Sequence, residues 1–114
     1  MIMKKNKFNA KKTEYNGEVY DSAKEAKYAG YLNILKRSKD PKDKVVSYRR
    51  QVPFVAVVNG KKICTYILDF IVWYADERLE HIDVKGMKSG SAYQMFRLKK
   101  KLIESLYNIM IIEV

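Results

Sequence analysis

Ile67-Leu-Asp-Phe-Ile-Val-Trp73 is the stretch that decides the fold, because it is apolar on both faces of an extended chain. Strand alternation places Ile67 and Ile71 on one side and Leu68, Phe70 and Val72 on the other. Such a strand lies in the middle of a sheet and is covered on both sides. Asp69 interrupts it, and a buried carboxylate needs a cation, a metal or several hydrogen-bond donors. The alternative is an acid at an exposed strand end that pairs with a lysine.

The next predicted strand, His81-Ile-Asp-Val-Lys85, adds a second acid and a lysine. Alternation places Asp83 and Lys85 on the same face. Two carboxylates on neighbouring strands can hold a hard divalent ion such as Mg²⁺. A lysine beside them can orient or deprotonate a water and stabilise charge on a phosphate. The alternative is a cross-strand ion pair, since an acid two residues before a lysine is frequent in strands.

Turn and cap signals predict the elements around these two strands. In chain order, the sequence predicts a hairpin over 15–20 around Asn16-Gly17, a helix from Ser22 to Lys36, strands over 52–58 and 63–74 flanking Asn59-Gly60, a strand over 79–85, a loop over 86–90, a helix over 92–107 and a buried strand over 109–114. We expect residues 1–12 to form a basic arm, which either contacts phosphates or serves as a solubilising tail, and residues 13–114 to form one domain of α+β type. Its mixed central sheet has a helix on each side, in the order αβββαβ.

Helical periodicity adds two candidate site residues. Glu25 falls on the apolar stripe of the first helix, which is expected to face the sheet; this stripe contains Tyr28, Ala29, Leu32 and Leu35. The alternative for Glu25 is a capping box with Ser22. Lys99 falls within the apolar stripe of the second helix, formed by Met95, Leu98, Leu102, Ile103 and Leu106, whereas Arg97, Lys100 and Lys101 fall outside it. Lys99 either reaches a carboxylate or a phosphate, or extends along its stem to solvent.

Composition narrows the chemistry. The 114 residues include 23 Lys and Arg against 13 Asp and Glu, a net charge of +10 that favours a polyanionic partner such as nucleic acid. Cys64 and His81 are each alone, which excludes an internal disulfide, a CxxC zinc site and a metal site of several histidines. Chemistry must therefore come from carboxylates and lysines. With neither a membrane-length apolar run nor a signal-like start, we expect a cytoplasmic protein without a membrane partner.

The order of the acids, Glu25, then Asp69, then Asp83-Val84-Lys85, resembles the PD-(D/E)XK nuclease superfamily. Its members place a helical Glu before an Asp on a central strand and (D/E)-x-Lys on the next strand, in a restriction-endonuclease-like αβββαβ core. Two positions differ: Leu68 stands where the superfamily's name has proline, and Asp83 stands where Glu is commoner. Neither difference removes a metal ligand.

The chain is more narrowly similar to small nucleases of bacteriophages and related bacteria, of the Holliday-junction-resolvase-like branch. The segments that carry this likeness are Tyr20-Asp-Ser-Ala-Lys-Glu-Ala-Lys-Tyr28, Gln51-Val-Pro-Phe54, Tyr66-Ile-Leu-Asp-Phe70, Asp83-Val-Lys-Gly-Met-Lys88 and Phe96-Arg-Leu-Lys-Lys-Lys-Leu102. The similarity as a whole extends over nearly all of the chain after the basic arm.

The resemblance implies Mg²⁺-dependent hydrolysis of DNA phosphodiesters in phage DNA recombination or processing, with Mn²⁺ as a substitute metal. Asp69, Asp83 and the Val84 carbonyl would hold the metal, Glu25 would complete the site directly or through water, and Lys85 would position the attacking water. The remaining candidates are Gln51 and Lys99 near the site, and Lys11, Lys12, Arg49, Arg50, Lys88, Arg97, Lys100 and Lys101 along the DNA backbone.

No base-reading motif accompanies these basic residues, so we expect selectivity for DNA structure, such as a branched junction, rather than for sequence. A symmetric homodimer could cut two strands of such a junction. Two alternatives stay open: a nucleic-acid-binding module without catalysis, which the net charge alone supports, and a nuclease subunit that acts only within a larger complex.

Overall fold

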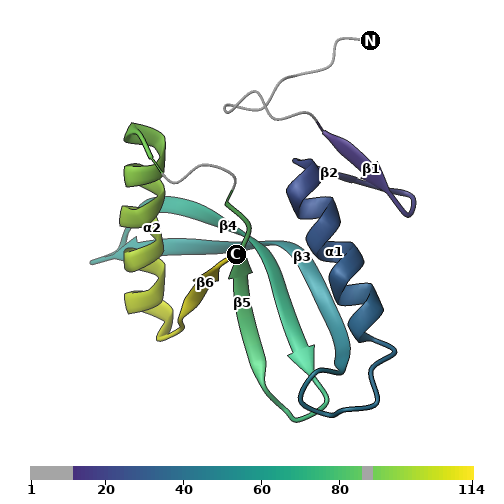
Figure 1. Cartoon of the computed structure of the whole chain (residues 1–114). Helices are drawn as coiled ribbons and strands as arrows, with labels where there is room; N and C mark the ends of the chain where they lie inside the picture. The colour runs from purple at the N-terminus through teal and green to yellow at the C-terminus, as the bar shows by residue number, and fades with distance from the viewer. Residues whose placement is uncertain (1–11, 86–88) are drawn as a thin grey trace.

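The computed structural model describes residues 12–85 and 89–114 of this mixed α+β chain (Figure 1). In chain order the elements are β1 (Thr13–Tyr15), β2 (Glu18–Tyr20), α1 (Ala23–Leu35), β3 (Val45–Val58), β4 (Lys61–Tyr74), β5 (Leu79–Asp83), α2 (Ser91–Tyr107) and β6 (Ile111–Glu113). The predicted order αβββαβ is therefore confirmed, with a small hairpin in front of it. Neither helix of the described part has the length and apolar character of a membrane span.

Local sequence signals account for the element boundaries. Asn16-Gly17 and Asn59-Gly60 both adopt positive φ at the two turn positions, as tight hairpins between antiparallel strands require. Ser22 is the N-cap of α1, and its side-chain hydroxyl accepts a hydrogen bond of 3.1 Å from the backbone N–H of Glu25. The predicted hairpins and the predicted start of the first helix are thus confirmed.

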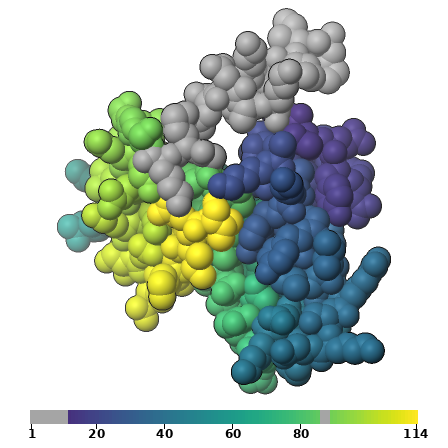
Figure 2. Space-filling model, in the orientation of Figure 1, coloured from purple at the N-terminus to yellow at the C-terminus, as the bar shows by residue number. Residues whose placement is uncertain are grey.

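The main sheet has the order β3-β4-β5-β6, in which only β6 runs parallel to its neighbour β5. β4 and β5, which carry the predicted acids, are therefore the two central strands. The expectation of a buried strand over 109–114 is wrong except at Ile111, because β6 lies at the sheet edge; Met110 is 74% exposed and Ile112 is 37% exposed. Figure 2 accordingly shows the yellow C-terminal segment at the surface between the two helices.

Each helix covers one half of the sheet from opposite faces. The core under α1 contains Ala26, Ala29, Leu32, Phe70, Val72 and Ile82. The core under α2 contains Ala56, Tyr66, Leu68, Ile71, Ile103 and Ile111. Glu25 lies on the predicted sheet-facing stripe of α1 and is buried.

Regular alternation fails in the middle of the β3–β4 hairpin. Leu68 and Phe70 are two residues apart, yet they belong to different cores. On β3, Tyr48 packs with the α1 core and Val52 packs with the α2 core. Between these two residues, Gln51 has a positive φ of 52°. The strand faces predicted for Leu68 and Phe70 are therefore wrong, because both strands reverse their faces at this point. Figure 1 shows the β3–β4 hairpin bending along its length, from its end near α1 to its end near α2.

The sheet-facing side of α2 also differs from the prediction. Met95, Leu98 and Leu106 are 53%, 63% and 43% exposed, whereas Ile103 is fully buried. Lys100, which was expected outside the stripe, is half-buried and pairs with Glu113 of β6 at 3.1 Å. The helix is rotated because its contacts are set by the polar and aromatic partners beneath it, which periodicity does not identify.

Candidate active site

Asp69 lies where the β3–β4 hairpin changes faces, next to the central strand β5. Its Oδ2 accepts a hydrogen bond of 2.8 Å from the backbone N–H of Val84. The register that pairs Phe70 with Ile82 brings Asp69 alongside Asp83. Asp69 is therefore held inside the sheet, not at an exposed strand end.

Asp83 is the most deeply buried acid of the site, with 2% of its surface exposed. Its Oδ2 accepts a hydrogen bond of 2.7 Å from the hydroxyl of Tyr66 and lies 3.3 Å from the Nζ of Lys85. Tyr66 was not among the predicted site residues. It lies on β4 in the same segment as Asp69, but no sequence signal distinguishes it from a core tyrosine.

Lys85 lies between an acid and an aromatic ring. Besides its ion pair with Asp83, its ammonium lies 3.7 Å from the ring centre of Phe96 on α2. The Lys85 side chain is 22% exposed. These two contacts therefore hold the ammonium in place while the side chain still reaches solvent. The Nζ of Lys24, at the start of α1, donates to the backbone carbonyl of Lys85 and fixes the end of β5 against that helix.

Glu25 reaches the same cluster from α1. Only 4% of Glu25 is exposed, and its Oε1 accepts a hydrogen bond of 2.8 Å from the Nε2 of Gln51. The same Nε2 lies 3.4 Å from the Oδ1 of Asp69. Ser22 thus caps the helix at the Glu25 backbone, while the Glu25 side chain points into the site. Gln51 bridges the two acids.

Electrostatics favour a shared proton in this cluster. Burial, a hydrogen bond that protonated Asp69 donates to the Asp83 carboxylate, and repulsion by Asp83 and Glu25 raise the pKa of Asp69 to about 9, against an opposing effect of the Val84 N–H. Burial and the charge of Asp21 raise the pKa of Glu25, while Arg50 opposes the rise. Since like-charged carboxylates raise one another's pKa, a cation bound between them would reduce their repulsion and favour their ionised forms.

The donor set fits a hydrated hard cation. Within residues 12–85 and 89–114, no group of three or more His, Cys, Asp or Glu residues is placed to hold a metal ion by itself. Mg²⁺ commonly binds through one or two carboxylates and keeps several waters, so the pair of Asp69 and Asp83 supplies suitable oxygen donors. Glu25 is held by Gln51 instead.

The basic residues predicted to contact DNA divide into exposed and internally paired side chains. Lys12, Arg49, Arg97 and Lys101 are exposed. Arg50 stacks over the ring of Tyr20 at 3.6 Å and pairs with Glu18, and Lys100 pairs with Glu113. Lys99 is half-buried, with no hydrogen bond or ion pair to the acids within the described part of the chain. Lys11 and Lys88 lie outside the described residues.

Fold and site together define a mixed α+β domain with a buried carboxylate–lysine cluster on its two central strands. Residues 5–112 match the family described as Protein of unknown function (DUF1064), so the chain belongs to that family. No curated protein and no solved structure matches the chain.

Proposed function

We propose that this protein is a Mg²⁺-dependent DNA endonuclease. The observation that carries the proposal is the pairing of Asp69 and Asp83 on the central strands with Lys85 beside them. Two buried acids side by side destabilise a fold, and a carboxyl whose pKa is strongly raised by burial and by a neighbouring acid is a candidate for a functional site. The resemblance to PD-(D/E)XK nucleases assigns the same residues to catalysis.

The carboxylates of Asp69 and Asp83, with the Val84 carbonyl, would hold the metal. When bound, Mg²⁺ would supply Lewis acidity toward a phosphate oxygen and lower the pKa of a bound water. The Val84 N–H fixes Asp69, and the Tyr66 hydroxyl fixes Asp83, so both acids are oriented before substrate arrives.

Lys85 has the position to serve the attacking water. Asp83 and the Phe96 ring restrict its ammonium, which can then donate to a water or to a phosphate oxygen. In the proposed reaction the attacking water gives up a proton to bulk solvent as its oxygen bonds to phosphorus, and the bond from phosphorus to the 3′-oxygen breaks. The departing 3′-oxygen takes up a proton, which leaves a 5′-phosphate and a 3′-hydroxyl.

The proposed substrate is branched DNA. The exposed cations Arg49, Arg97 and Lys101 can contact backbone phosphates, which position DNA without reading its bases. A homodimer of this chain would present two such sites to the two strands of a junction.

Cleavage of a labelled four-way junction and of a linear duplex tests the proposal, with Mg²⁺ or EDTA. Wild type is expected to cut the junction only with metal. Asp83→Ala and Asp69→Asn are expected to lose cutting at least a hundredfold and keep binding, because the basic surface is unchanged. Asp43→Asn, which alters an exposed acid, is the matched control and is expected to cut like wild type.

Wild type that binds DNA but cuts neither substrate with Mg²⁺ or Mn²⁺ would contradict the proposal. Calorimetry with Mg²⁺ would then separate the two alternatives. A binding module predicts no metal uptake at Asp83, whereas a subunit that needs a larger complex predicts uptake that Asp83→Ala removes.

A further inference from the structure

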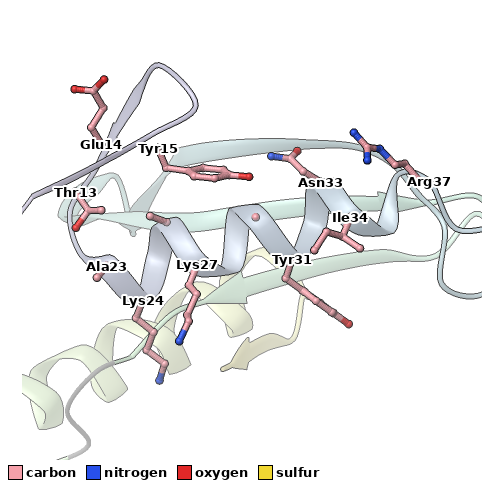
Figure 3. A pocket seen from close by; sticks show the side chains of 12 residues that line it. Thr13, Glu14, Tyr15, Ala23, Lys24, Lys27, Tyr31, Asn33, Ile34 and Arg37 are labelled. Carbon is pink, nitrogen blue, oxygen red and sulfur yellow. The ribbon is translucent and has the colours of Figure 1, made fainter.

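A hollow of the described residues lies outside the carboxylate site. It is a groove of about 930 Å³ between the outer side of α1 and strand β1 (Figure 3). The residues that line it are Thr13, Glu14, Tyr15, Ala23, Lys24, Ala26, Lys27, Gly30, Tyr31, Asn33, Ile34 and Arg37. We refer to it as the α1 groove.

Two tyrosines border the α1 groove from opposite sides. In Figure 3, Tyr15 extends from β1 along one side of α1, and Tyr31 projects from the helix on the other side. Tyr15 is 36% exposed and Tyr31 is 51% exposed. Gly30 lies between them, and a Cβ there would be 3.4 Å from the Tyr15 hydroxyl, so a longer side chain would fill the space. Aromatic faces are therefore available to a ligand.

The charge of the groove selects an anionic ligand. Among its lining residues Lys24, Lys27 and Arg37 are basic, and only Glu14 is acidic. Cations that follow a groove, together with aromatic faces, form the combination that binds single-stranded nucleic acid, where phosphates meet the cations and bases stack on the rings. A duplex keeps its base faces stacked inside and cannot use the tyrosines in this way. An acidic peptide would use the cations alone.

The α1 groove borders a second hollow that lies beside the candidate active site. Lys24, Lys27 and Tyr31 also line a second hollow of about 250 Å³ that reaches Val84. The Nζ of Lys24 donates to the backbone carbonyl of Lys85. A strand that leaves the carboxylates past Val84 therefore meets Lys24 and Lys27 first, and Tyr31 next.

We propose that the α1 groove binds an unpaired nucleic-acid strand that continues from the scissile phosphate. As a statement about the substrate, this inference rests on the proposed nuclease function, but strand binding itself does not require cleavage. The substrate class is thus a branched DNA that carries a single-stranded segment beside the cut.

Fluorescence anisotropy with a labelled oligothymidine in EDTA tests strand binding apart from catalysis. Tyr31→Ala combined with Lys27→Glu is expected to weaken binding at least tenfold, because a stacking face and a phosphate contact are lost together. Lys61→Glu makes the same charge change at an exposed position far from the groove and is expected to weaken binding less than threefold. Tyr31→Phe keeps the ring and is expected to bind like wild type.

A melting curve for each variant shows that the fold is intact; the changed side chains are exposed. Oligothymidine binding that survives the double variant, or that Lys61→Glu weakens equally, overturns the proposal. An oligoglutamate is also tested as a competitor of the oligothymidine. If it competes on the wild-type protein but not on the double variant, the proposal is overturned in favour of an acidic peptide as the ligand.

The two proposals can fail separately. Groove-dependent strand binding by a protein that cuts no DNA would leave the groove assignment in place and remove the nuclease. The opposite outcome is metal-dependent cutting that requires Asp83 but not Tyr31 or Lys27, on junctions with and without an unpaired strand. That outcome would support the nuclease and contradict the groove assignment.

Discussion

Asp69 gives the folded protein a pH dependence that the unfolded chain lacks. Burial and its acidic neighbours raise the pKa of Asp69 from 3.8 to about 9, so between these values the folded state holds a proton that the unfolded state releases. In EDTA, the free energy of unfolding is therefore expected to fall as pH rises through this window, with a slope of at most about 1.4 kcal/mol per unit. Asp69→Asn is expected to flatten the slope and to be more stable than wild type at pH 8.

Urea unfolding of both proteins from pH 5.5 to 8.5 checks this prediction. Burial lowers the pKa of His81, which gives an opposite slope near its ordinary titration range. Because His81 is present in both proteins, the difference between their two profiles isolates the site. Parallel profiles would contradict the shared proton. Asp43→Asn is expected to follow wild type at every pH.

Tyr66 is expected to position Asp83 rather than to touch substrate. Its hydroxyl donates to Asp83 across a buried 2.7 Å contact, so Tyr66→Phe removes a hydrogen bond to an acid and leaves that acid less well solvated. We expect a loss of about 2 kcal/mol in the free energy of unfolding. We also expect about tenfold weaker Mg²⁺ binding, measured by calorimetry.

Tyr48→Phe is the matched control for Tyr66. The Tyr48 hydroxyl donates to the Oδ1 of Asn33 at 3.0 Å, on the α1 side and away from the acids. Its loss is expected to lower stability by about 1 kcal/mol and to leave Mg²⁺ binding unchanged. Equal effects of both variants on Mg²⁺ binding would show that Tyr66 acts only through general stability.

At the scale of elements, strand β3 depends on one residue in the left-handed region. Gln51 has φ of 52°, where a side chain is strained and glycine is not. Gln51→Ala and Gln51→Gly lose the same amide bridge to Glu25. We therefore expect the glycine variant to be the more stable of the two by about 1 kcal/mol in urea unfolding.

The same pair of substitutions at Ser47 provides the control. Ser47 is an exposed residue of the same strand and is not among those with positive φ. There glycine costs backbone entropy without relieving strain, so Ser47→Gly is expected to be less stable than Ser47→Ala. If alanine were also the better residue at position 51, the face reversal in the hairpin would not depend on a left-handed backbone.

Elements were predictable where the signal is local. The Asn-Gly turns and the Ser22 cap are set by two to four neighbouring residues, and the structure confirms them. The face reversal at Gln51 and Asp69 was not predictable, because a glutamine with positive φ inside a strand has no sequence signature. The rotation of α2 depends on Lys100 meeting Glu113, a contact made only in the folded chain.

For the whole molecule, the sequence predicts that Asp69 and Asp83 lie on neighbouring strands, which the structure confirms, but it does not show how their side chains are held. Predicted alternation placed Asp83 and Lys85 on one face, and they form an ion pair. Tyr66 and Gln51, which hydrogen-bond to Asp83 and Glu25, lie on the two strands of the hairpin that bends beside the acids. The α1 groove depends on how β1 lies against α1, which no pattern within either element determines.

The net charge of +10 predicts DNA binding that weakens with salt, but not every cation contributes equally. Arg97 and Lys100 lie three residues apart on α2; Arg97 is exposed, whereas Lys100 is paired with Glu113. A plot of log affinity against log salt for duplex DNA in EDTA is expected to lose about one unit of slope in Arg97→Ala. Lys100→Ala is expected to retain the slope, because its ammonium is already neutralised within the protein. The reverse order would mean that the Lys100–Glu113 pair opens to reach phosphate, and that the DNA-binding face includes the edge of the sheet at β6.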